Sequence, residues 1–199
     1  MSARYVITGT DTNVGKTVFA AALAGHLRAR YWKPVQAGLD GASDTMRVSD
    51  LSGGQAQIIP ESYRLNTPCS PHEAARIDGV RIEPDRLTLP EGTAPLIIEG
   101  AGGVLVPFSE TMLAADLFAQ WALPVILVAR TALGTINHSL LTIEALRARG
   151  VHIHSVAFMG EANLASEDAI TQFGCVRHLG RLPLLDPLTS HTLARAFAT

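Results

Sequence analysis

A loop that ends in Gly-Lys-Thr, placed between an apolar run and a helix-like segment, restricts the fold of this chain more than any other feature. Residues 8–17 read T-G-T-D-T-N-V-G-K-T, follow the apolar run 5–7, and lead into a segment with helical character at 18–28. A strand, such a loop and then a helix form the layout of a phosphate-binding P-loop. We therefore expect the chain to bind a nucleotide.

The last three residues of this loop have residue types that suit phosphate. Gly15 lets backbone amides approach a phosphate, Lys16 places a charge near the β- and γ-phosphates, and the Thr17 hydroxyl can bind magnesium. The pattern G-x-x-x-x-G-K-[ST] has glycine where this chain has Thr10, and Gly9 lies one position early. The alternative is a turn with a solvated lysine, which the flanking strand and helix disfavour.

Length and composition describe an ordinary globular chain. With 199 residues, 47% of them hydrophobic and 17% charged, we expect one domain over residues 1–199. The net charge of −2 provides no basic surface for nucleic acid. The two cysteines have no metal or redox spacing, and the longest apolar run, 123–129, is too short to cross a membrane. The first residues run straight into a strand, so we expect no signal peptide and a cytoplasmic protein.

Runs rich in Val, Ile and Leu alternate with helical patterns along the chain. Strands are expected at 5–8, 31–35, 95–99, 125–129, 152–158 and, weakly, 176–179. Helices are expected at 18–28, 43–51, 114–121, 137–149, 166–173 and 192–198. This alternation predicts a doubly wound α/β domain of three layers, with a mostly parallel sheet flanked by helices.

Ligands of such sheets bind beyond the carboxyl ends of the strands, and two charged residues fall there. Glu99 ends an apolar strand before the glycine-rich segment 100–103, which suits an acid that reaches a magnesium ion beside phosphates. Lys33 leaves the second strand into Pro34, where it can neutralise phosphate or another anion. The alternatives are an acid that caps a loop and a lysine that is solvated.

Three helix starts are further candidates. Asp44 and Asp50 both flank the helix 43–51, and spacing alone does not choose between them. Ser70 is predicted to be the N-cap of another helix, whose start can also hold an anion. Asn137 is predicted to cap a later helix, where free amides make a site for a carboxylate. No cysteine or histidine lies at metal-ligand spacing from the neighbouring histidine, and no nucleophile triad is legible.

Five segments in series resemble the dethiobiotin synthase family: G-T-D-T-N-V-G-K-T, K-P-V-Q-A-G, S-P-H, E-G-A-G-G and L-G-T-I-N-H. The resemblance runs from residue 8 to about residue 160. It implies a ligase that uses ATP and Mg²⁺ to join CO2 to 7,8-diaminononanoate and close the ureido ring of dethiobiotin. It also implies a carbamate and a carbamic-phosphoric anhydride as intermediates, and a homodimer with sites at the subunit interface.

The resemblance also assigns residues. It implies that Lys16, Lys33 and Thr12 act in catalysis, and that Thr17, Asp44 and Glu99 hold magnesium. It implies nucleotide contacts at Asp11, Thr12, Asn13, Val14, Gly15, Lys16, Thr17, Val18, Glu99, Gly102, Gly160, Leu182, Pro183 and Leu184. It implies diamine contacts at Thr12, Lys33, Ala37, Ser70, Pro71 and His72, and at Gly134, Thr135, Ile136 and Asn137 of the second subunit.

This sequence departs from the family at three positions. Ala37 stands where many relatives carry a hydroxyl beside the diamine, so that hydrogen bond is absent or is replaced by Gln36 or water. Asn13 stands where some relatives have an acid, and it receives no protonic role. Gly160 stands where some relatives place an asparagine against the base, which leaves backbone groups and the segment 182–184.

Two other functions compete with this interpretation. ATPases of the partition and septum-positioning kind carry a second lysine early in the loop, where this chain has Asp11. Synthetases of the cobyric acid type have the same fold but need a glutaminase domain, for which 199 residues leave no room. The loop sequence disfavours the first alternative, and the length disfavours the second.

Overall fold

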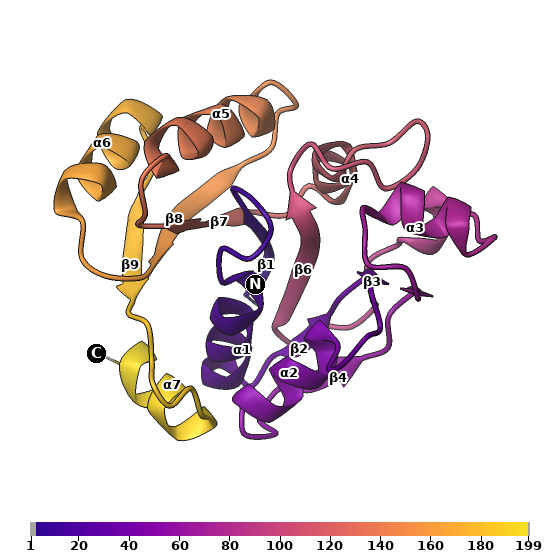
Figure 1. The fold of residues 1–199 in the computed structure, drawn as a ribbon, viewed down its shortest axis with the longest axis horizontal. Coiled ribbons are helices and arrows are strands. Elements are labelled where there is room, and N and C mark those ends of the chain that lie inside the picture. Colours follow the sequence, from indigo (N-terminus) through magenta and orange to yellow (C-terminus); the bar gives the residue numbers. More distant parts are fainter. Residues whose placement is uncertain (1–2, 199) are drawn as a thin grey trace.

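A parallel sheet of seven strands forms the centre of the protein (Figure 1). The computed structural model describes residues 3–198. The seven strands are β1 (Arg4–Gly9), β2 (Arg30–Trp32), β4 (Gln57–Ile59), β6 (Leu96–Gly103), β7 (Val125–Arg130), β8 (Ile153–Met159) and β9 (His178–Leu182). They lie in the order β4-β2-β6-β1-β7-β8-β9, with every neighbouring pair parallel. Beside this sheet, β3 (Val35–Ala37) pairs with β5 (Tyr63–Leu65) in a second, two-stranded sheet.

Helices cover both faces of the main sheet. They are α1 (Lys16–Leu27), α2 (Asp44–Leu51), α3 (Pro71–Ile77), α4 (Ala114–Trp121), α5 (Thr135–Arg147), α6 (Leu164–Gly174) and α7 (Ser190–Phe197), with a short 3-10 helix at Pro84–Arg86. Alternate side chains of each strand point to opposite faces. Ile7 and Ile97 pack with α1, α2 and α7, whereas Val6 and Ile98 pack with α4. Helices α5 and α6 cover β7 and β8 on the same face as α4.

The predicted doubly wound α/β architecture is confirmed, but several strand boundaries were wrong. The strand expected at 31–35 is two strands in different sheets, because the chain leaves the main sheet at Lys33 and Pro34, and proline has no N–H for a ladder. The strand expected at 95–99 continues through the glycines to Gly103. The last strand begins two residues later than expected, and β4 and β5, of three residues each, were not predicted.

The two helix caps predicted at functional positions had different outcomes. Asn137 is not an N-cap: α5 begins at Thr135, and Gly134 is the cap, with a φ of 91° that favours glycine. Ser70 does hold the N-cap position of α3, but its hydroxyl makes no capping bond and instead lies 3.1 Å from His72 Nδ1. Glycine suits the position before α5 because it adopts this left-handed backbone without a steric cost.

Two further features concern the lengths of the helices and the state of the two cysteines. Among residues 3–198, no helix combines the length and apolar character needed to cross a bilayer. Cys69 and Cys175 are both free and exposed.

The aromatic packing beneath α4 gives a test of this core. Phe118 is 1% exposed and stacks on Trp121 with ring centroids 5.8 Å apart. Because truncation leaves a cavity, Phe118→Ala should lower the free energy of unfolding by about 3–5 kcal/mol in urea titrations. The matched control is Phe173→Ala on α6, where the ring is 78% exposed and the change should stay within about 0.5 kcal/mol. Equal losses in the two variants would contradict the assigned packing.

Candidate functional site

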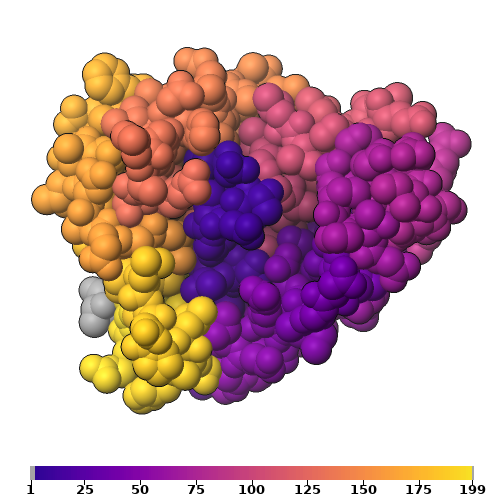
Figure 2. Space-filling model, in the orientation of Figure 1, coloured from indigo at the N-terminus to yellow at the C-terminus, as the bar shows by residue number. Residues whose placement is uncertain are grey.

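A cavity of about 680 Å³ opens where the P-loop, the end of β2 and the end of β6 meet. We call it the central cavity. Predicted site residues in its lining are Thr12, Asn13, Gly15, Lys16, Thr17, Val18, Lys33, Ala37, Asp44, Ser70, Pro71, Glu99 and Gly102. Figure 2 shows the N-terminal part of the chain, in indigo, at the centre of one face between the magenta and orange segments. Residues far apart in the sequence therefore surround the loop.

Two glycines explain why the loop departs from the usual pattern. A Cβ on Gly9 would lie 2.6 Å from Val14 Cγ2, so position 9 has no room for a side chain. Thr10 donates its N–H to the Val128 carbonyl at 3.1 Å and so continues the strand pairing, which leaves no need for glycine there. Gly15 has a φ of 96° and is the N-cap of α1. Glycine at position 9 is thus explained by the close packing of Val14 against it.

Lys16 contacts its own loop. Its Nζ donates to the Asp11 carbonyl at 2.6 Å, and the side chain is largely buried. Burial, with a further contribution from the neighbouring Lys33, lowers the pKa of Lys16 to about 8. A nearby anion would favour the charged form and would give the ammonium a stronger partner than a carbonyl.

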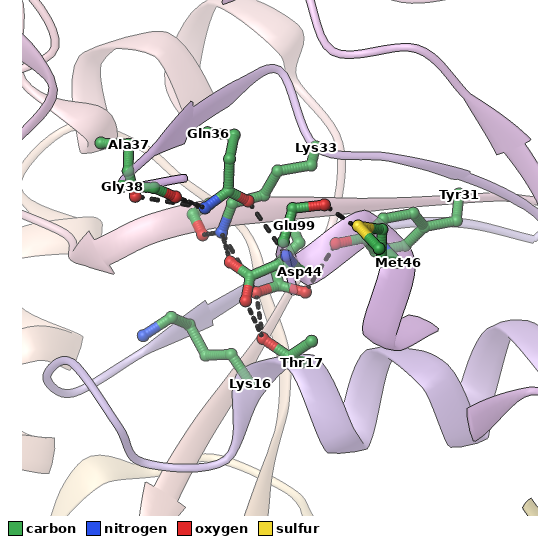
Figure 3. A network of polar contacts seen from close by, with 12 residues as sticks. Lys16, Thr17, Tyr31, Lys33, Gln36, Ala37, Gly38, Asp44, Met46 and Glu99 are labelled. Carbon is green, nitrogen blue, oxygen red and sulfur yellow. Dashed lines mark hydrogen bonds and ion pairs between the residues drawn. The ribbon is translucent and has the colours of Figure 1, made fainter. Parts of the chain in front are cut away.

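Four side chains beneath the loop form a network that we call the charged cluster: Thr17, Lys33, Asp44 and Glu99 (Figure 3). The Thr17 hydroxyl lies 2.8 Å from Glu99 Oε1 and 3.1 Å from Asp44 Oδ1. Lys33 Nζ lies 2.8 Å from Asp44 Oδ2 and 3.2 Å from Glu99 Oε1. It also donates to the Gly100 carbonyl at 3.0 Å. A single ammonium thus bridges two acids from different parts of the chain.

The protonation of this cluster follows from burial and pairing. Burial opposes the charged form of Lys33, but Glu99 and Asp44 outweigh it and raise the pKa of Lys33. Burial likewise opposes the Asp44 carboxylate, yet Lys33 and the Thr17 hydroxyl lower its pKa. Burial, followed by the Glu99 charge, raises the pKa of Tyr31, which therefore stays a hydrogen-bond donor. Lys33 and Asp44 therefore keep their charges near neutral pH.

The oxygen atoms of this cluster fit a magnesium ion. Thr17, Asp44 and Glu99 present a hydroxyl and two carboxylates, the hard ligands that Mg²⁺ prefers. Within residues 3–198, no group of three or more His, Cys, Asp or Glu residues is arranged to hold a metal. An ion bound by these three residues would take its other ligands from phosphate and water, as Mg²⁺ commonly does at nucleotide sites.

Some predicted site residues lie outside the central cavity. Its lining does not include Asp11, Val14, His72, Gly134, Thr135, Ile136, Asn137, Gly160, Leu182, Pro183 or Leu184. His72 faces a separate hollow under α3. Thr12 lines both the central cavity and a second hollow of about 430 Å³, which we call the side hollow, formed with residues of α5. Thr12 therefore lies between two candidate binding surfaces.

Sequence reasoning did not assign Tyr31, Arg47 or the role of Gln36. The Gln36 amide bonds the Asp44 N–H and two backbone carbonyls, so both of its N–H donors are already engaged. Tyr31 could have been found, because in the strand expected at 31–35 it precedes Lys33 by two positions and the period of two puts both on one side. The position of Arg47 in the cavity lining depends on where α2 packs, which the sequence does not reveal.

Comparisons with known proteins identify relatives of this chain. A family model described as an AAA domain matches residues 3–192. The chain is 61% identical to the ATP-dependent dethiobiotin synthetase BioD of Rhodopseudomonas palustris, over all of this chain and 96% of that protein. It is 56% identical to the protein of that name from Agrobacterium fabrum, over all of this chain and 94% of that protein. The chain belongs to the dethiobiotin synthetase family.

Solved structures of more distant members of the P-loop fold also match. The cell division ATPase MinD of Pyrococcus furiosus has a TM-score of 0.64 at 13% identity, over 99% of this chain and 95% of that one. A ParA family ATPase from Chlorobium tepidum has a TM-score of 0.61 at 11% identity, over 100% and 98%. At these identities the likeness establishes the fold alone, so it does not revive the alternative of a partition ATPase.

The charged cluster gives a second stability test. Lys33→Met should lower the free energy of unfolding by about 3–5 kcal/mol, because the buried Glu99 carboxylate then lacks its counter-charge. Lys16→Met is the matched control and should lower stability less, because the Lys16 ammonium bonds a carbonyl rather than a buried acid and burial disfavours its charged form. Urea titrations at pH 7 measure both. An unchanged free energy of unfolding in Lys33→Met would show that the ion pairs of Lys33 with Asp44 and Glu99 do not stabilise the fold.

Proposed function

We propose that this chain is an ATP- and Mg²⁺-dependent C–N ligase that forms dethiobiotin from 7,8-diaminononanoate and CO2, with release of ADP and phosphate. Membership of the dethiobiotin synthetase family supports the reaction. The observation that carries it is the meeting of the P-loop, Lys33 and the Ser70-Pro71 wall in one cavity. We also propose one P-loop domain over residues 1–199 and a cytoplasmic location.

The proposed reaction needs positioning rather than a protein nucleophile. One substrate amine attacks CO2 and loses a proton, which gives a carbamate. A carbamate oxygen then attacks the γ-phosphorus, the bond from that phosphorus to the bridging oxygen of ADP breaks, and ADP departs as the carbamic-phosphoric anhydride forms. The second amine attacks the carbonyl carbon, the C–O bond to phosphate breaks, and the ring closes. Since both attacks come from the substrate, the protein has to align reactants and stabilise negative charge.

Lys16, Lys33 and Thr12 carry the proposed catalytic roles. Lys16 exchanges the Asp11 carbonyl for the γ-phosphate and stabilises the charge that develops there. Lys33 faces the carbamate and the transferring phosphate, and Thr12 faces the diamine. Thr17, Asp44 and Glu99 would hold Mg²⁺, which when bound neutralises phosphate charge and orients the leaving group.

The nucleotide base is assigned to the ends of β8 and β9. Gly160 donates its N–H to the Leu182 carbonyl at 3.0 Å, and its own carbonyl accepts from Arg181 at 3.3 Å. With these backbone groups engaged and no asparagine side chain, Pro183 and Leu184 supply apolar contacts to the base. Such contacts discriminate weakly between bases, so we expect other nucleoside triphosphates to compete with ATP.

The diamine carboxylate is assigned to the second subunit of a homodimer. The start of α5, residues 134–137, lies outside the central cavity of its own chain and is exposed except at Thr135. Leu105 and Leu141 line the side hollow and are 52% and 56% exposed, which supports an apolar contact with another copy. A second chain seated there would bring its α5 amides toward Thr12.

The proposed reaction is tested by incubating the protein with ATP, Mg²⁺, bicarbonate and the diamine, and detecting dethiobiotin by mass spectrometry. We expect ADP release that depends on both the diamine and bicarbonate. Turnover of ATP that ignored both compounds would refute the proposed function.

Loss of the P-loop lysine should affect the chemical step. Lys16→Ala should lower kcat by at least about a hundredfold, because a charge partner of the transferring phosphate is removed. Arg195→Ala, which removes an exposed cation on α7, is the control and should leave kcat unchanged. Turnover of Lys16→Ala close to that of the control would exclude Lys16 from the mechanism.

Mixed dimers test whether two chains form each site. Asn137→Ala should weaken diamine binding and leave nucleotide affinity intact, since Asn137 lies in the first turn of α5. Mixing this variant with Lys16→Ala should restore part of the activity, because one of the two sites in each mixed dimer keeps both residues. Heterodimers without recovered activity would show that each chain forms its own complete site.

A further inference from the structure

Two buried side chains next to the charged cluster have no part in the proposed chemistry. Tyr31, in β2, is fully buried and donates its hydroxyl to Glu99 Oε2 at 2.9 Å. Gln36, in β3, is 7% exposed and bonds the backbone N–H of Asp44. Each therefore contacts a different one of the two acids, and Figure 3 shows them reaching the cluster from two strands.

Gln36 ties together the two ends of the loop between β3 and α2. Its Nε2 donates to the carbonyls of Ala37 and Gly38 at 3.1 and 3.2 Å, and its Oε1 accepts from Asp44 N at 3.1 Å. The opposite amide orientation would set an oxygen against two carbonyls, so the contacts define the orientation. Asp44 is the first residue of α2, where the N–H has no partner inside the helix. Gln36 thereby determines where Asp44 sits.

Tyr31 orients the other acid. Glu99 has one oxygen, Oε2, facing the Tyr31 hydroxyl and the other, Oε1, facing Thr17. The Glu99 side chain is 1% exposed, so the phenol supplies a hydrogen bond to Oε2 that bulk water supplies to an exposed carboxylate. Without the phenol, the carboxylate would be held only through Oε1, which accepts from Thr17 and Lys33. The hydrogen bond from Tyr31 to Oε2 therefore fixes the plane of the carboxylate.

We propose that Tyr31 and Gln36 are positioning residues that hold Glu99 and Asp44 in the geometry that binds the divalent cation. The proposal rests on the proposed function, which assigns a cation to these acids. Neither side chain is assigned a contact with the ion, because Tyr31 is outside the cavity lining and the Gln36 amide bonds backbone groups. Removing a side chain that orients a metal ligand typically lowers metal affinity by about 10–100-fold.

Binding of Mn²⁺, a spectroscopic substitute for Mg²⁺, tests the proposal without turnover. Tyr31→Phe keeps the ring and Gln36→Met keeps the length of the side chain, so both should fold, as thermal unfolding can verify. Electron paramagnetic resonance measures free Mn²⁺ as the protein is titrated in the presence of ADP. The Kd for Mn²⁺ should be at least about tenfold higher in each variant than in the unaltered protein. Binding of ADP in EDTA should be unchanged. In assays, the KM for Mg²⁺ should rise more than kcat falls.

Tyr63→Phe is the matched control. Tyr63 is buried in β5, and its hydroxyl accepts from Glu83 N at 2.8 Å, so this variant loses a comparable hydrogen bond away from the acids. It should bind Mn²⁺ like the unaltered protein. Should Gln36→Met fail to fold, Gln36→Asn, which shortens the amide by one methylene, tests the same contacts.

The outcomes separate this inference from the proposed function. Mn²⁺ affinities of the Tyr31 and Gln36 variants that match Tyr63→Phe would overturn the positioning role and leave the cation site standing. Failure of the unaltered protein to bind Mn²⁺ with ADP would overturn the cation site, and the positioning role with it.

Discussion

The site depends on a carboxylate that the fold removes from water. Glu99 is 1% exposed, and burying an isolated carboxylate costs several kcal/mol unless partners replace its hydration. Its partners are the hydroxyls of Thr17 and Tyr31 and the ammonium of Lys33, which come from α1, β2 and the segment after β2. The P-loop, β6 and β2 therefore have one set of relative positions in which all three partners reach the Glu99 carboxylate. The order of the strands places all of these partners within reach.

Stability alone does not explain such a cluster. A buried ion pair commonly contributes little, and apolar residues of similar volume often stabilise a fold as well or better. The chain contains only two lysines, Lys16 and Lys33, and both line the central cavity, while its other fourteen cationic residues are arginines. A compact ammonium suits a point contact with phosphate, whereas a guanidinium prefers planar, bidentate partners. The use of lysine only here fits a cavity built for phosphate chemistry.

Much of this site could be predicted because the fold turns sequence order into position. Once the chain alternates strands and helices, residues that follow parallel strands meet at one edge, which located Lys16, Lys33 and Glu99 near one another. Asp44 could not be assigned in this way, because spacing did not distinguish it from Asp50. It was assigned only through the family resemblance. The structure supports that choice, because Asp44 contacts both Lys33 and Thr17.

The features that were missed depend on packing between segments that are distant in the sequence. The short strands β3 and β5 have three residues each, which is too few to show a period, and they exist because each pairs with the other. Asn137 has a strong capping propensity, yet the turn before α5 requires a positive φ that Gly134 supplies, and backbone geometry prevails over side-chain preference. Gln36 resembles any polar residue of a short strand until the start of α2 is known. Its role arises from a contact across eight residues, which local patterns do not encode.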